Sequence, residues 1–225
     1  MSDSESVSGK MREYYEQHGL AGAFVWFSGK VLKRLWRFVY QGVDYKLGIC
    51  SLRDAPLSAA GNDADVLCRV MTRDDLEGIR QKFGESLSGA FSERLKHSTG
   101  YIVYCEGHVA GYAWSSSGLL ENEGIKPFLV NLRPYEKTAY VYDCFTLPEY
   151  RNKKLFSRLL DYLLMDMKQK GLEKGFLTVR KDNFPMLKVI AKHGFAIEGE
   201  IKCRKYLFFK SISNDAFSKV CTVIP

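Results

Sequence analysis

The segment YVYDCFTLPEYRNKKLFS, residues 140–157, constrains the fold of this chain more than any other stretch of its sequence. Its Tyr, Val and Phe content predicts a strand over Thr138–Leu147. The turn at Pro148 leads directly into a helix predicted over Lys153–Lys170, where leucines recur at helical spacing and Gly171 marks the end. A buried strand therefore opens straight into a long amphipathic helix.

Strands and helices alternate on both sides of this unit. Glu106-Gly107-His108 is a tight-turn sequence and predicts a hairpin, while Gly118–Lys137 suggests a long surface loop. Further strands are predicted over 45–52, 66–71, 101–105, 109–115, 175–179, 196–203 and 205–211, and helices over 73–83, 86–96 and 183–194. This succession predicts an α/β fold, a mixed and mostly antiparallel twisted sheet of six or seven strands flanked by helices on both faces.

The chain shows one compositional boundary, the Ala-, Asp- and Gly-rich stretch RDAPLSAAGNDAD at residues 53–65, which we interpret as a linker. Before it lies an extension, residues 1–52, predicted to be helical in its basic and aromatic part. After it comes the main domain, residues 66–212, and a carboxy-terminal tail, residues 213–225.

Composition narrows the classes of partner and compartment. Thirty-three Lys and Arg against 26 Asp and Glu give a net charge of +7, which favours anionic partners. The six cysteines are dispersed and form no cluster with histidine, which predicts reduced thiols, a cytoplasmic location and no metal site. No apolar stretch reaches the roughly 20 residues of a membrane span, and the polar, acidic start does not have the pattern of a signal peptide.

The predicted start of the helix at Lys153 is a candidate anion site. The first amides of a helix have no intrahelical partner, and the helix dipole adds about half a positive charge there. Arg151, Lys153 and Lys154 place three fixed charges at the same point, so a pyrophosphate would fit. The alternative is a solvated basic helix start after a sharp turn.

These residues resemble the signature of the GCN5-related N-acetyltransferase superfamily. In that family a strand and a Pro-containing turn precede Arg-x-x-Gly-x-Gly/Ala at the start of a long helix, where amides bind the pyrophosphate of acetyl-CoA. The similar segment here is Leu147–Phe156. Asn183 with Gly194-Phe195 is similar to the family's Asn and Gly-Phe at the ends of its next helix, and Gly111-Tyr112-Ala113 is similar to a frequent hairpin motif. The resemblance covers about residues 66–210.

The resemblance implies the acyl-CoA N-acyltransferase fold and transfer of an acetyl group from acetyl-CoA to a primary amine, without a metal. It also implies that two parallel strands separate to admit the pantetheine arm, that a main-chain amide near Phe145–Leu147 contacts the thioester oxygen, and that Asn183 contacts the pantetheine or an ordered water. The residues expected to bind acetyl-CoA are Phe145, Thr146, Leu147, Arg151, Asn152, Lys153, Lys154, Leu155, Phe156, Ser157 and Asn183. The acceptor itself is open; a sugar-nucleotide or lipid-linked amino sugar would suit a chain whose extension seeks a surface.

Three positions depart from the family pattern. Lys154 and Phe156 stand where the signature has glycine or a small residue, which removes room for a phosphate. Ile190 stands where many members have a tyrosine that protonates the departing thiolate. These departures favour an alternative function, a non-catalytic acyl-CoA-binding module. A second alternative is a long-chain acyltransferase that uses acyl carrier protein, whose acidic surface would suit the net charge of +7.

Two residues are candidates for proton transfer. Asp143 is the one carboxylate on the central predicted strand and is a candidate base; the alternative is a hydrogen-bonded or salt-bridged residue. Tyr206 is a candidate donor to the thiolate; the alternative is a packed aromatic residue.

The segment Leu20–Tyr40 interleaves tryptophan and phenylalanine with lysine and arginine. This composition suits a helix packed across the domain, a dimer interface, or a helix lying on a membrane surface; the last would place the protein at the inner face of the membrane. Nucleic acid binding is disfavoured, because no zinc motif or RNA-binding aromatic pair is present.

Overall fold

A computed structural model describes residues 40–56, 65–117, 119–120, 129–131, 136–206, 209–214 and 222–224. Residues 20–39, which carry most of the basic and aromatic segment, lie outside this part, as does the predicted helical extension. The chain divides into two compact units, residues 1–43 with 203–211, and residues 44–202 with 212–225. The described residues of the first unit are ends of strands, and the candidate site lies in the second.

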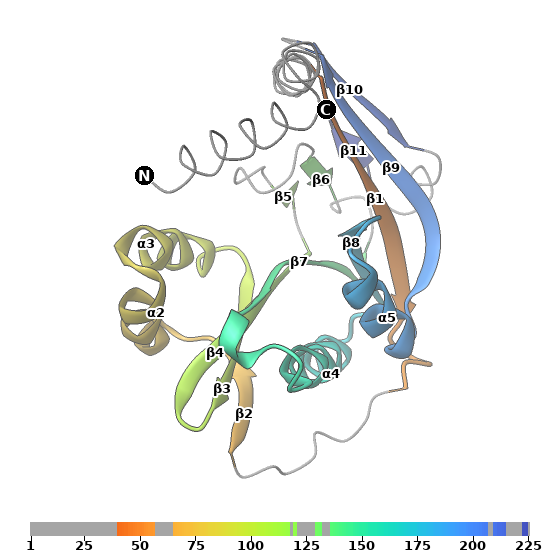
Figure 1. The fold of residues 1–225 in the computed structure, drawn as a ribbon. Coiled ribbons are helices and arrows are strands. Elements are labelled where there is room, and N and C mark those ends of the chain that lie inside the picture. Colours follow the sequence, from red (N-terminus) through yellow and green to blue (C-terminus); the bar gives the residue numbers. More distant parts are fainter. Residues whose placement is uncertain are drawn as a thin grey trace, which may run out of the picture. The chain divides into compact units, whose positions relative to one another are not determined.

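The main sheet has eight strands in the order β10-β9-β1-β8-β7-β4-β3-β2. They are β1 (Tyr40–Ser51), β2 (Val66–Val70), β3 (Thr99–Cys105), β4 (His108–Ser116), β7 (Thr138–Thr146), β8 (Lys174–Arg180), β9 (Ala196–Tyr206) and β10 (Phe209–Asn214) (Figure 1). β7 and β8 run parallel, whereas the other main-sheet pairs with a described register are antiparallel. This confirms the predicted mixed α/β sheet.

The sheet is wider than predicted because β1 belongs to it. Residues Tyr45–Ser51 pair antiparallel with β8, from Tyr45 opposite Arg180 to Ser51 opposite Lys174. The compositional boundary at residues 53–65 instead assigns this strand to the extension before the linker. Sequence order does not reveal this pairing, because the two strands are separated by most of the domain.

Helices cover both faces of the sheet, as predicted. α2 (Leu76–Phe83) and α3 (Glu85–Arg94) follow a 3₁₀ turn, η1 (Arg73–Asp75), and lie on one side of β4, with α4 (Leu155–Gln169) on the other (Figure 1). A second 3₁₀ turn, η2 (Pro148–Tyr150), precedes α4, and α5 (Phe184–Lys192) follows β8. Within the described part of the chain, no helix combines the length and the hydropathy needed to cross a membrane.

The two faces of the sheet are packed differently. Under α4 the core is mostly aliphatic, because its ridge of Leu159, Leu163 and Met167 is fully buried. Under α3 the core is aromatic, with the Phe91 ring in edge-to-face contact with Tyr112 and Trp114 at centroid distances of 4.8 and 4.9 Å. The aromatic face is therefore the one that adjoins α3.

A separate three-stranded antiparallel sheet contains β5 (Leu119–Leu120), β6 (Leu129–Asn131) and β11 (Thr222–Ile224). The sequence predicted a loop at 118–137 and an unpatterned tail. Strands of two or three residues are too short for the alternation that identifies a strand, which is read over about 4–8 residues.

The parallel strands β7 and β8 separate at the middle of the sheet. Their pairing runs from Thr138 opposite Lys174 to Val141 opposite Leu177, although β7 continues to Thr146 and β8 to Arg180. Next to the separation, the register between β7 and β4 shifts, and Asp143 adopts a positive φ of 44°. A bulge at this point bends a strand, and the described geometry thus directs the second half of β7 away from β8.

Candidate active site

The start of α4 forms a basic turn with exposed side chains. Two residues in it, Asn152 and Lys154, have left-handed backbones with φ of 64° and 60°. Lys154 precedes the helix, and no side chain caps the first turn. The first helical hydrogen bond joins the Arg158 amide to the Lys154 carbonyl at 3.2 Å. The amides of Leu155, Phe156 and Ser157 precede it and are therefore the donors that a helix start offers to an anion.

The three basic residues of this turn have different surroundings. Arg151 folds back on β7, where its Nε donates to the Thr146 carbonyl at 3.2 Å and its guanidinium lies 5.9 Å from the centre of the Phe145 ring. The Lys153 ammonium lies 5.4 Å from the centre of the Tyr150 ring. Arg151 thus braces the turn, while Lys153 and Lys154 are exposed at the helix start.

The main-chain amides at the end of β7 alternate in direction. The Leu147 amide donates to the Ala110 carbonyl of β4 at 2.9 Å. The Phe145 carbonyl also faces β4, because a Cβ placed on Gly111 would lie 2.5 Å from it. Since successive residues of a strand direct their polar groups to opposite neighbours, the Thr146 amide points toward β8, where the two strands have separated. Of the main-chain amides at 145–147 that are expected to contact the thioester oxygen, the Thr146 amide is therefore the one directed into the opening.

Asp143 forms an ion pair that the sequence did not predict. Its Oδ2 accepts a hydrogen bond from Arg94, the last residue of α3, whose side chain is only 4% exposed. The Arg94 guanidinium lies between 5.2 and 5.6 Å from the ring centres of Phe91, Trp114 and Tyr142. Asp143 is thus a salt-bridged residue, which is the alternative expected for it from the sequence.

Aromatic rings lie beside this ion pair. Phe145 stacks on Tyr112 at 5.7 Å, and Phe83 contacts both rings edge-on at 6.0 and 5.7 Å. Burial raises the pKa of Tyr112, and the nearby Asp143 carboxylate raises it further. Tyr112 therefore stays a neutral hydroxyl beside the charged pair.

A buried histidine joins α4 to α5, a contact that no sequence motif predicts. His193 Nδ1 lies 2.7 Å from the Val189 carbonyl, which fixes this nitrogen as the donor. Its Nε2 lies 3.1 Å from the Ser157 hydroxyl and 3.3 Å from an Asp161 oxygen. Ser157, expected to bind acetyl-CoA, thus has a hydroxyl that contacts His193, and its amide is the part directed to the helix start.

The structure places three other predicted residues. Asn183 caps α5, because its Oδ1 accepts the Met186 amide at 3.3 Å. Ile190, at the position of the family's tyrosine, is fully buried in the core. Tyr206 ends β9, but its side chain lies outside the described part. No cluster of three or more potential metal-ligating side chains occurs within the described ranges.

Comparison with known proteins agrees with this architecture. The profile of the acetyltransferase (GNAT) family matches residues 69–195. A GNAT-family protein from Novosphingobium aromaticivorans superposes with a TM-score of 0.51 at 19% identity, covering 73% of this chain and 64% of that one. A GCN5-related N-acetyltransferase from Sphaerobacter thermophilus gives 0.54 at 13% identity, covering 79% and 56%.

A third similar structure is the GCN5-related glucosamine N-acetyltransferase region of a fungal multi-domain GH3 β-N-acetylglucosaminidase. It gives a TM-score of 0.54 at 8% identity and covers 84% of this chain and 23% of that one. The chain thus spans less than two thirds of the length of all three structures, and identities this low show the shared fold. A search of curated proteins found no match.

Proposed function

Since this chain belongs to the acetyltransferase (GNAT) family, whose profile matches more than half of it, we propose that it transfers an acetyl group from acetyl-CoA to a primary amine. The observation that carries the proposal is the separation of β7 from β8 beyond Val141 and Leu177. This opening lies beside a helix start with unpaired amides and exposed lysines, which together suit a thioester on a long phosphorylated arm.

The pyrophosphate of acetyl-CoA is proposed to bind the amides of Leu155, Phe156 and Ser157. Lys154 supports this assignment, because it adopts the left-handed backbone that glycine adopts without strain. Phe156 is compatible with it, because its half-buried side chain packs against the core beneath α4. Lys153 and Lys154 would add charge to the site, and Arg151 would hold the turn.

The reaction needs an amine lone pair, a donor for the oxyanion and a proton acceptor. We assign the oxyanion to the Thr146 amide because of its direction. Asp143 is the proposed base: its Oδ2 pairs with Arg94, so Oδ1 is the oxygen that would accept an amine proton, directly or through water. The thiolate is protonated by water or by Tyr206, because Ile190 has no proton to give.

Amino sugars are the acceptor class that we propose to test first. The support is the shared fold with a structure described as a glucosamine N-acetyltransferase region.

Thermal-shift measurements with CoA, acetyl-CoA and palmitoyl-CoA distinguish the acyl donor, since a long-chain enzyme is stabilised most by the palmitoyl thioester. A non-catalytic module would bind acetyl-CoA and leave every amine unacetylated.

The phosphate site is tested by reversing two charges. Lys153→Glu with Lys154→Glu should weaken CoA binding at least tenfold, or by about 1.4 kcal/mol, in a calorimetric titration. The matched control is Lys188→Glu with Lys192→Glu, which makes the same change in net charge on exposed positions of α5. Equal losses in both variants would point to the overall field of the protein, and an unchanged affinity in the first variant would overturn the site.

A further inference from the structure

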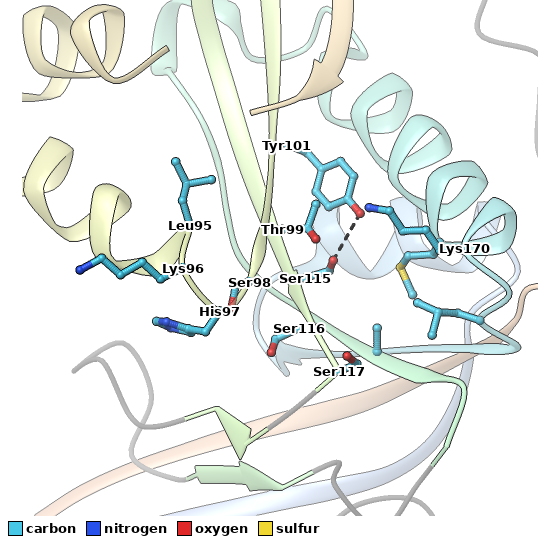
Figure 2. A pocket seen from close by; sticks show the side chains of 13 residues that line it. Leu95, Lys96, His97, Ser98, Thr99, Tyr101, Ser115, Ser116, Ser117 and Lys170 are labelled. Atoms are coloured by element: carbon cyan, nitrogen blue, oxygen red, sulfur yellow. Dashed lines mark hydrogen bonds between the residues drawn. The ribbon is translucent and has the colours of Figure 1, made fainter. Parts of the chain in front are cut away.

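A cavity of about 520 Å³ lies at the end of the main sheet where β3 begins and β4 ends (Figure 2). Its walls come from the residues after α3, from Ser115–Ser117, and from the end of α4. A cavity of this volume is in the range of small-molecule sites, about 300–1,000 Å³. Ala139 lines it, seven residues before Thr146 on β7. At about 3.3 Å per residue, the cavity is roughly 20 Å along the strand from the proposed oxyanion site.

A directed chain of hydroxyl groups forms part of the wall. The Tyr101 hydroxyl donates to Asp166 Oδ2 at 2.7 Å, and the Ser115 hydroxyl donates to the Tyr101 oxygen at 3.3 Å. Tyr101 and Ser115 are buried, and burial raises the pKa of Tyr101, so it keeps its proton. Because both protons are committed toward Asp166, the Ser115 oxygen has lone pairs left to accept a hydrogen bond from a ligand.

The charged side chains in the wall are already paired. Lys170 contacts Asp166 at 2.6 Å, and Lys96 contacts Glu93 at 2.6 Å. The remaining polar side chains are the His97 imidazole and several hydroxyls. Among these hydroxyls, those of Thr99 and Ser117 make no side-chain hydrogen bond within the described part of the chain. Hydroxyl groups both donate and accept, so they match a ligand that itself carries hydroxyls better than they match an ion.

We propose that this cavity binds an uncharged, hydroxyl-rich molecule of about monosaccharide size, at a site separate from that of acetyl-CoA. The proposal does not depend on the acetyl-transfer reaction. Ser115 accepts a ligand hydroxyl, and Thr99 and Ser117 complete the contacts at the rim. The buried Met167 and Ala139 supply the apolar part of the wall.

The test is a titration of the full chain with glucose and with myo-inositol, followed by backbone amide NMR. Ser115→Ala removes the acceptor and leaves the Tyr101–Asp166 bond in place. The matched control is Ser86→Ala, the same substitution at an exposed position of α3 outside the cavity. Inorganic phosphate at equal ionic strength serves as the charged probe. Ser117→Ala, at an exposed position, repeats the test should Ser115→Ala fail to fold.

We expect saturable shifts at Thr99, Ser115 and Ser117 with at least one of the two polyols, and an affinity three- to tenfold weaker in Ser115→Ala, as loss of one hydrogen bond gives. Ser86→Ala should bind like the parent. The proposal is overturned if neither polyol shifts these amides, if phosphate alone does, or if the cavity variant binds as tightly as the parent.

Discussion

At the scale of single residues, Lys154 carries backbone strain at a position where the family uses glycine. A left-handed backbone costs a residue with a Cβ about 1–2 kcal/mol, and nothing in the described turn suggests that the lysine side chain is needed to form it. Lys154 therefore lowers the stability of the fold but places a positive charge beside the proposed phosphate site.

Lys154→Gly should raise the free energy of unfolding by about 1 kcal/mol. Glycine relieves the strain of the folded backbone, and the greater conformational entropy that it gives the unfolded chain offsets part of this stabilisation. Chemical denaturation measures this change. Lys153→Gly is the control, since Lys153 is not among the residues with positive φ, and it should be neutral or destabilising. Equal effects of the two substitutions would contradict the strain argument.

Arg94 is expected to hold the bulge of β7 in place. Arg94→Met removes the partner of Asp143 and leaves a largely buried carboxylate uncompensated, so stability should fall by about 3–5 kcal/mol. The double variant Arg94→Met with Asp143→Asn should recover part of this loss in denaturation experiments. A double variant as unstable as the sum of the two single variants would show that the pair is not coupled.

Asp143→Asn tests the proposed base. The variant should lower kcat for acetyl transfer at neutral pH by roughly 10²–10⁴-fold, while CoA affinity stays near that of the parent. Steady-state kinetics across pH, with calorimetry of CoA binding, separates the two effects. Turnover equal to that of the parent would place the base elsewhere or in solvent.

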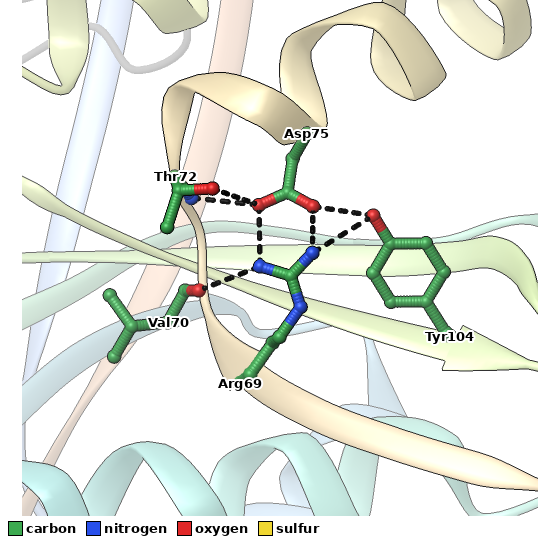
Figure 3. Close-up of polar contacts among 5 residues, drawn as sticks. All are labelled: Arg69, Val70, Thr72, Asp75 and Tyr104. Carbon is green, nitrogen blue, oxygen red and sulfur yellow. Dashed lines mark hydrogen bonds and ion pairs between the residues drawn. The ribbon is translucent and has the colours of Figure 1, made fainter.

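At the scale of elements, the turn from β2 into α2 is held by one carboxylate. Asp75 Oδ2 accepts from the Thr72 amide at 2.7 Å and from Arg69 Nη1 at 2.8 Å, and Oδ1 accepts from the Tyr104 hydroxyl at 2.5 Å (Figure 3). A second Arg69 nitrogen also contacts Oδ1. The network thus ties η1 to the edge of the main sheet.

This network makes stability depend on pH. Burial alone would raise the pKa of Asp75, but the hydrogen bonds from Thr72 and Tyr104 and the Arg69 ion pair outweigh it and lower the pKa below the usual value. Its stabilisation is therefore fully present above the unfolded pKa of about 3.9 and is lost as the pH falls toward the folded pKa. The stability difference between the parent and Asp75→Asn should be constant from neutral pH to about 5 and shrink below 4. A difference that does not change in acid would contradict this assignment.

At the scale of the whole molecule, the basic and aromatic segment Leu20–Tyr40 could contact either protein or an anionic surface. We expect it to pack on protein. Because β1 begins at Tyr40 and pairs with β8 from Tyr45, deletion of residues 1–39 leaves that pairing intact and should still lower stability by exposing apolar surface. Phosphatidylglycerol vesicles should not sediment the intact protein.

The membrane alternative has the opposite signature. Each basic residue near an anionic surface contributes about 1 kcal/mol, so binding to the vesicles would be strong, would fall with salt and would disappear on deletion of residues 1–39. Sedimentation at two salt concentrations distinguishes the two outcomes, and strong salt-sensitive binding would show that our expectation is wrong.

The sequence by itself determined the longer helices and strands of the main domain. The leucine ridge of α4, the hairpin turn at Gly107 and the cap at Asn183 depend on residues close together in the chain, so periodicity and turn chemistry revealed them. The resemblance of the strand, turn and helix start to a family signature also came from contiguous residues. α4 begins at Leu155, two residues after the predicted start at Lys153. The reason is that Asn152 and Lys154 adopt left-handed backbones, which their residue types do not predict.

Tertiary structure alone decided which distant residues meet. Arg94 pairs with Asp143 across 49 residues, and His193 reaches Ser157 across 36. The hydrogen bond from the Leu147 amide to Ala110 of β4 leaves the Thr146 amide as the proposed oxyanion donor. The hydroxyl-lined cavity is assembled from the ends of α3, β4 and α4. Local patterns show how each segment folds, whereas these contacts depend on strand order and on the bulge that bends β7. No spacing along the chain encodes either of them.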